Sequence, residues 1–153
     1  MRRFVNPGNT AFEVAVNSQI YVDKTGLLAY TNSVINTKQA LICSSRPRRF
    51  GKSITADMLC AYYSRGCDSD SIFASYEIAK SDSYKKYLNQ YDVIYLDIQW
   101  CMMDAGSAEQ TVSYLNYHVI EELKEIYPQI LLDGIRTAYG AMSCINAQTG
   151  VKF

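Results

Sequence analysis

The sequence predicts an α/β protein of three layers, in which helices cover both faces of a parallel sheet. Apolar runs of strand length alternate with longer amphipathic stretches along the chain, and this alternation is typical of such folds. The 153 residues suffice for one domain with a sizeable core. Apolar residues make up 48% and charged residues 20%, which is ordinary globular composition. We therefore expect residues 1–153 to form a single domain.

The first half of the chain supplies two strand candidates and two helices. The run "QALICSS" is apolar and ends in small polar residues, as a buried strand does. The polar triplet Asp23-Lys24-Thr25 is expected to form a turn that caps the next helix. In chain order, the expected elements are a strand at 19–22, a helix at 26–36, a strand at 39–45 and a helix at 53–64.

The second half repeats the alternation. Ser107 and Gln110 predict a capping box at the start of a long helix. The expected elements are a short exposed helix within 81–91, a strand at 92–100, helices at 107–127 and 132–146, and the first residues of a third strand at 149–153. An interior strand does not stop after so few residues. We therefore expect an incomplete domain, truncated after its second or third core strand.

The stretch "RPRRFGKS" (46–53) lies between a predicted strand and a predicted helix, where a phosphate-binding loop belongs. Lys52 is placed to reach the β- and γ-phosphates of ATP, Ser53 to ligate Mg²⁺, and Gly51 to let the backbone approach. Arg46 replaces the usual first glycine, and Pro47 can set the turn instead. The residues expected to bind nucleotide are Pro47, Arg48, Arg49, Phe50, Gly51, Lys52, Ser53 and Ile54.

Other functions compete with ATP binding at the same loop. It could be a solvated basic turn, or a non-catalytic interaction module that grips a partner's acidic or phosphate groups. A small P-loop phosphotransferase is a further alternative. That enzyme would need a lid that carries several arginines. Arg136 is the only arginine in the sequence after residue 67, which argues against this alternative.

Two further residues could carry chemistry. Asp97 ends the apolar run "VIYLD", so it could be a Mg²⁺-binding acid of the kind called Walker B, or simply end a different core strand. His118 lies beside the apolar stripe of its predicted helix and has no Ser or Cys partner at a recognisable spacing, which favours a packing role.

Charge and cysteine content bound the surroundings of the protein. Fifteen basic and fifteen acidic residues balance, so no global field draws the chain to nucleic acid or to a membrane. The five cysteines are scattered, which argues against a zinc site and suits a reducing compartment. The sequence shows neither an apolar leader nor a run of about 20 apolar residues. We expect a cytoplasmic protein; its oligomeric state stays open.

Four stretches resemble the AAA-ATPase-like family of P-loop proteins. They are "YVDKT" (21–25), "RPRRFGKS" (46–53), "AYYSRGCDS" (61–69) and "YDVIYLDIQW" (91–100), which together span most of the chain. In that family the arginine-rich form of the loop is usual, so Arg46 fits its relatives.

The resemblance also implies features outside residues 1–153. Family members continue past a "TGVKF"-like segment into an apolar strand that ends in Asp-Glu, the Walker B acids. By this comparison Asp97 ends another strand, and Asp23-Lys24-Thr25 is a signature segment that would pack beside the nucleotide. The full-length protein would be an ATPase, whereas this chain alone would be inactive or nearly so. The family often carries a C-terminal nuclease-like domain of the PD-D/E-XK type, which implies a nucleic-acid partner.

Overall fold

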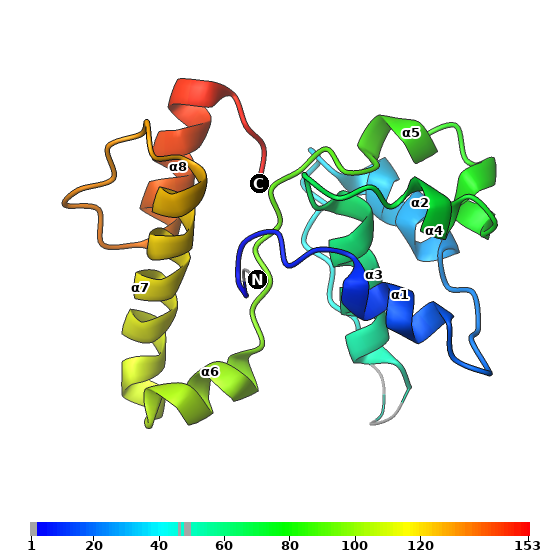
Figure 1. The fold of residues 1–153 in the computed structure, drawn as a ribbon, viewed down its shortest axis with the longest axis horizontal. Helices are drawn as coiled ribbons and strands as arrows, with labels where there is room; N and C mark the ends of the chain where they lie inside the picture. The colour runs from blue at the N-terminus through cyan, green and yellow to red at the C-terminus, as the bar shows by residue number, and fades with distance from the viewer. Residues whose placement is uncertain (1–2, 46, 48–49) are drawn as a thin grey trace. The chain divides into compact units, whose positions relative to one another are not determined.

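The computed structural model describes residues 3–45, 47 and 50–153, and its regular structure is helical (Figure 1). Contacts group the chain into two compact units, which we call the loop unit (residues 8–90) and the α7 unit (residues 3–7 with 91–153). The loop unit holds α1 (Thr10–Val16), α2 (Gly26–Val34), α3 (Lys52–Tyr63), α4 (Asp70–Phe73), the 3₁₀ helix η1 (Glu77–Lys80) and α5 (Tyr84–Tyr87). The α7 unit holds α6 (Ile98–Ala105), α7 (Ala108–Ile126) and α8 (Ala138–Thr149).

The predicted parallel sheet is wrong. Within the described residues no strand forms, and extended pairing is limited to isolated bridge positions, such as the antiparallel pair Val5 and Ile94. The expected strand at 39–45 is irregular, and Leu41 within it is 96% exposed. The expected strand at 92–100 gives way to α6 at Ile98. A strand needs a neighbour about 4.8 Å away to bond its N–H and C=O groups, and an apolar run does not supply that neighbour.

Aromatic side chains form the core of the loop unit. Phe12 of α1 stacks on Phe73 of α4 at 5.1 Å between ring centroids, and Tyr62 of α3 meets Phe73 edge-on at 5.4 Å. Leu28 of α2 and Met58 of α3 are buried in the same unit. Full burial of such side chains stabilises a fold by about 1.5–3 kcal/mol each. The core thus fixes α3, the helix that the predicted phosphate loop precedes.

A buried polar network joins α2 to the C-terminal end of α3. Tyr63 Oη donates to Asn32 Oδ1 at 2.7 Å and lies 2.6 Å from Thr31 Oγ1. Asn32 Nδ2 donates to Tyr62 Oη at 3.0 Å, and Tyr62 Oη donates onward to the Tyr84 carbonyl at 2.8 Å. Because each of these groups is paired, their burial does not carry the cost of an unmade hydrogen bond.

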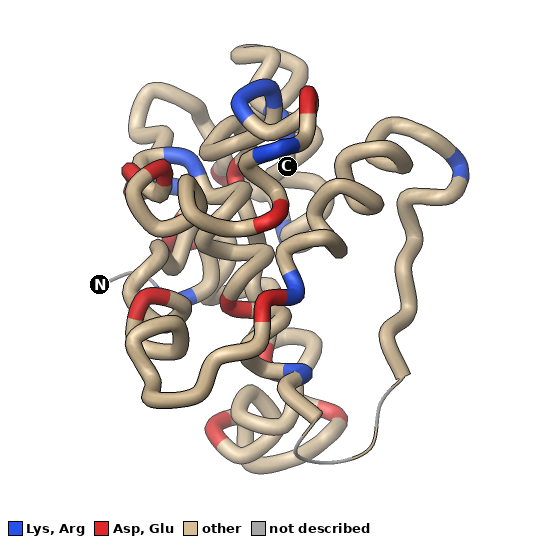
Figure 2. Tube along the Cα trace, turned by 90° about the vertical axis from the view of Figure 1, so that its right-hand side faces the viewer, with Lys and Arg blue, Asp and Glu red and all other residues tan. Residues whose placement is uncertain are grey.

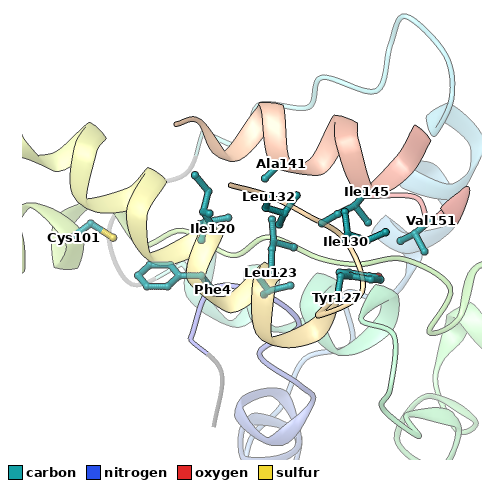
Figure 3. Close-up of a cluster of buried hydrophobic side chains, with 12 residues drawn as sticks. Phe4, Cys101, Ile120, Leu123, Tyr127, Ile130, Leu132, Ala141, Ile145 and Val151 are labelled. Carbon is teal, nitrogen blue, oxygen red and sulfur yellow. The ribbon is translucent and has the colours of Figure 1, made fainter. Parts of the chain in front are cut away.

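The α7 unit is built around the apolar faces of α7 and α8 (Figure 3). The Glu122 carboxylate on α7 accepts hydrogen bonds from three successive backbone N–H groups, those of Arg3, Phe4 and Val5, at 2.7–3.0 Å. This pairing holds the N-terminal segment on the helix. The buried cluster comprises Phe4, Val5, Cys101, Val119, Ile120, Leu123, Tyr127, Ile130, Leu132, Ala141, Ile145 and Val151.

Three expected helices are confirmed with small changes at their ends: α2, α3 and α7. The cap half of the predicted capping box is confirmed, because Ser107 Oγ accepts from the Gln110 N–H at 3.3 Å. The helix expected at 132–146 begins only at Ala138, where Thr137 caps it. Gly134, with φ +81°, interrupts the segment before that cap.

Both basic and acidic residues occur along each unit (Figure 2). Along the described residues, no helix combines the length and the apolar character that crossing a membrane requires. The described residues likewise hold no group of three or more His, Cys, Asp or Glu side chains placed to bind a metal ion.

Candidate functional site

The described part of the predicted phosphate loop folds back on the start of α3. Gly51 caps the helix in the left-handed region, at φ +75° and ψ +28°. Its carbonyl accepts from Thr55 N at 2.9 Å and from Thr55 Oγ1 at 3.0 Å. Lys52 Nζ donates to the Pro47 carbonyl at 3.2 Å, which brings the two ends of the loop together.

The side chains of this loop are open to solvent. Phe50 is 60% exposed and Ile54 is 39% exposed, and Lys52 and Ser53 also fall in the exposed class. Apolar side chains of this size are usually covered in a folded protein. Their exposure leaves the loop accessible to a ligand.

Lys24, which lies between α1 and α2 in the sequence, contacts the same loop. Its Nζ donates to the Phe50 carbonyl at 3.2 Å. A Cβ atom placed on Gly51 would lie 2.8 Å from Lys24 Nζ, closer than real Cβ contacts. Glycine therefore suits position 51 because of its backbone conformation, and a Cβ atom there would also displace the end of the Lys24 side chain.

The neighbours of Lys24 fix the backbone that carries it. Asp23 Oδ1 accepts from Thr25 N at 2.7 Å, and Asp23 Oδ2 accepts from Glu77 N at 2.9 Å. Thr25 is fully buried, and its Oγ1 accepts from Ile78 N at 3.1 Å. Partial burial opposes ionisation of Asp23, but the N–H groups of Glu77 and Thr25 outweigh it and lower the pKa of Asp23 below its ordinary value.

A pocket of about 270 Å³ lies beside Lys24. It is smaller than the roughly 300–1,000 Å³ of sites that enclose whole drug-sized ligands, so it suits part of a nucleotide rather than all of it. It combines a cation, a carboxylate and two hydroxyls. Its lining residues are Lys24, Gly26, Leu27, Ser44, Thr55 and Glu77.

This arrangement favours an anion. The first N–H groups of a helix have no partner within the helix, and the helix dipole places positive potential at the same end. Lys24 and Lys52 both direct their side chains to the loop that precedes α3. A phosphate chain satisfies unpaired N–H donors and ammonium groups at once.

The structure brings together the described members of the predicted nucleotide-binding set, which are Pro47 and Phe50 to Ile54. The predictions for Arg46, Arg48 and Arg49 fall outside the described residues. Asp97 belongs to the α7 unit, where its Oδ1 accepts from Trp100 N at 3.0 Å and caps α6. Its Mg²⁺ role stays a prediction. His118 packs against Phe4 and Tyr114, with ring centroids 5.9 and 4.3 Å away.

Sequence reasoning left four residues of this region without a role. Lys24 stood in a stretch that the family resemblance had marked, so a signal existed but no function followed from it. Ser44, Thr55 and Glu77 carried no signal, because the fold alone brings them to one pocket.

Comparison with known proteins identifies the family of the chain. The model of a family described as "Predicted AAA-ATPase" matches residues 8–145 of the chain. That range includes the whole loop, Lys24 and the pocket beside it. Neither a curated protein nor a solved structure matches the sequence.

Proposed function

Because the chain belongs to the predicted AAA-ATPase family, we propose that it binds ATP as the Mg²⁺ complex through residues 47–54. One observation carries the proposal: Gly51, in a left-handed conformation, turns the chain into α3 directly before Lys52 and Ser53. Such a turn aims backbone N–H groups at a ligand at the positive end of the helix.

Each described loop residue then has a task. Lys52 neutralises charge on the β- and γ-phosphates, and its side chain already lies over the loop on the Pro47 carbonyl. The exposed Ser53 hydroxyl would hold Mg²⁺, which supplies charge neutralisation when bound. Phe50 and Ile54 offer exposed apolar surface to the nucleotide. Arg48 and Arg49 are proposed as further phosphate partners on their sequence positions alone.

Hydrolysis is a separate step of the proposal. It needs a carboxylate that orients the attacking water, and the family resemblance gives that task to an acidic Walker B element. We therefore propose hydrolysis for a protein that contains this element. We likewise propose a cytoplasmic location and a nucleic-acid partner bound through a nuclease-like domain.

Calorimetric titration with Mg-ATP tests the loop assignment. Lys52→Ala should weaken binding by about 10- to 100-fold, the equivalent of one lost hydrogen bond to a charged group. The lost group is an ammonium, so tight binding should return in part with Lys52→Arg.

Lys86→Ala is the matched control. Lys86 is an exposed lysine on α5, and α5 packs at the C-terminal end of α3 through the Tyr62–Tyr84 contact. That end lies about 15 Å along the helix from Lys52, since an α-helix rises 1.5 Å per residue. The control should bind ATP as the wild type does. Equal ATP affinity in wild type and Lys52→Ala would refute the assignment.

A further inference from the structure

We propose that Lys24 is a second phosphate-binding lysine of the site, acting together with Lys52 at the same loop. This inference rests on the proposed function and deepens it. It assigns a ligand-binding role to the Asp23-Lys24-Thr25 triplet, for which the sequence left a plain turn as the alternative.

The position of the ammonium group is the first support. Lys24 Nζ lies 3.2 Å from the Phe50 carbonyl oxygen and reaches the space next to the Gly51 Cα. In the proposed function the same peptide units line the phosphates. The bond to Phe50 uses one of the three N–H groups of the ammonium, so the others remain available to a ligand.

The second support is that the three residues of the triplet make different contacts. Asp23 and Thr25 are both bonded to backbone N–H groups of η1, at Glu77 and Ile78. These bonds fix the backbone on either side of Lys24. Of the three residues, only Lys24 directs its side chain to the loop. The bonds of Asp23 and Thr25 to η1 therefore hold the Lys24 ammonium next to Gly51.

The charge on Lys24 is the third support. Among the residues that the structure describes, no carboxylate lies within ion-pair distance of its Nζ. Glu77 lines the same pocket without such a pair. A half-buried lysine without a counter-ion repels other cations and attracts anions. Together with Lys52 it gives the site two ammonium groups, which suits a polyphosphate better than a single phosphate.

The test compares Lys24→Gln and Lys24→Arg with the wild type, by calorimetric titration with Mg-ATP and with inorganic triphosphate. Glutamine keeps an N–H donor for the Phe50 carbonyl but loses the charge, whereas arginine keeps the charge. Lys24→Gln should weaken both ligands by about tenfold, the scale of one charge-assisted hydrogen bond. Lys24→Arg should bind more tightly than Lys24→Gln, and Lys86→Gln should match the wild type. Melting curves verify that every variant is folded.

The outcomes separate this inference from the function on which it rests. If Lys52→Ala weakens binding while Lys24→Gln binds both ligands as the wild type does, the Lys24 role is refuted and the loop assignment stands. A loss confined to ATP, with inorganic triphosphate unaffected, places Lys24 at the ribose or base and also refutes it. If wild type and Lys52→Ala are equal, the loop assignment fails and the Lys24 role fails with it.

Discussion

Gly51 is the residue on which the geometry of the loop depends most. Its positive φ is a conformation that side chains with a Cβ rarely adopt, and its missing Cβ leaves room for Lys24 Nζ. Gly66 offers a matched comparison, because its φ is +82° but nothing lies within 4 Å of its Cβ position. At Gly51, the absence of a Cβ therefore serves both the backbone conformation and the position of Lys24, whereas at Gly66 it serves the backbone conformation alone.

We predict that Gly51→Ala and Gly66→Ala lose similar stability, roughly 1 kcal/mol each, because both force alanine into the left-handed region. Only Gly51→Ala should weaken Mg-ATP binding, by about tenfold, because its methyl group displaces the Lys24 ammonium. Thermal unfolding and calorimetry measure the two effects. Wild-type ATP affinity in Gly51→Ala would show that Lys24 and the loop do not need this close approach.

At the residue scale, spacing predicts Gly51, Lys52 and Ser53 as nucleotide-binding residues, because a phosphate-binding loop constrains residue type at consecutive positions. Their role in binding stays a prediction. Lys24 could not be assigned in the same way. Its role depends on a contact 26 residues away in sequence, to Phe50, which no local pattern encodes.

At the scale of the elements, the junction of α2 and η1 fixes the backbone that carries Lys24. Asp23 accepts an N–H from each side of it, from Thr25 at the start of α2 and from Glu77 at the start of η1. The lowered pKa of Asp23 means that the folded state favours its charged form. The junction is therefore sensitive to acid.

We predict that Asp23→Asn lowers the free energy of unfolding by roughly 0.5–1 kcal/mol at pH 7, because both carboxylate oxygens accept hydrogen bonds and asparagine has only one acceptor oxygen, so one of the two N–H groups loses its partner. A group whose pKa is lowered in the folded state stabilises above its unfolded pKa, here near the ordinary value of 3.8. The stabilisation disappears as pH falls through the lower, folded value. Urea unfolding from pH 7 to pH 2.5 should show the two proteins converging below pH 4. A constant difference across that range would contradict the prediction.

Helices were easier to predict than strands in this chain. An amphipathic stripe and a cap are local signals, and they located α2, α3 and α7. Val112, an apolar residue of α7, is nevertheless 65% exposed, so apolar character alone does not place a side chain in the core. Strands depend on partners elsewhere in the chain. The run at 39–45 has strand-like composition but no partner among the described residues.

On the scale of the whole molecule, contacts divide the chain between the loop unit and the α7 unit. The loop, Lys24 and the pocket all belong to the first, which has its own aromatic core. The α7 unit has a separate apolar cluster and contains Asp97. Alternating element types suggested one continuous sheet. The actual division could not be predicted because it follows from contacts between distant segments, such as Glu122 with residues 3–5.

The central claim is that the backbone before and at the start of α3 binds the phosphates of ATP. Amide spectra of the ¹⁵N-labelled chain, recorded during titration with Mg-ATP, test it most directly. We predict that the largest changes in amide chemical shift fall on Gly51, Lys52 and Ser53, and that they saturate with the Kd measured by calorimetry. The amide chemical shifts of α8 should not change. Saturable shifts elsewhere, with these three amides unmoved, would contradict the claim.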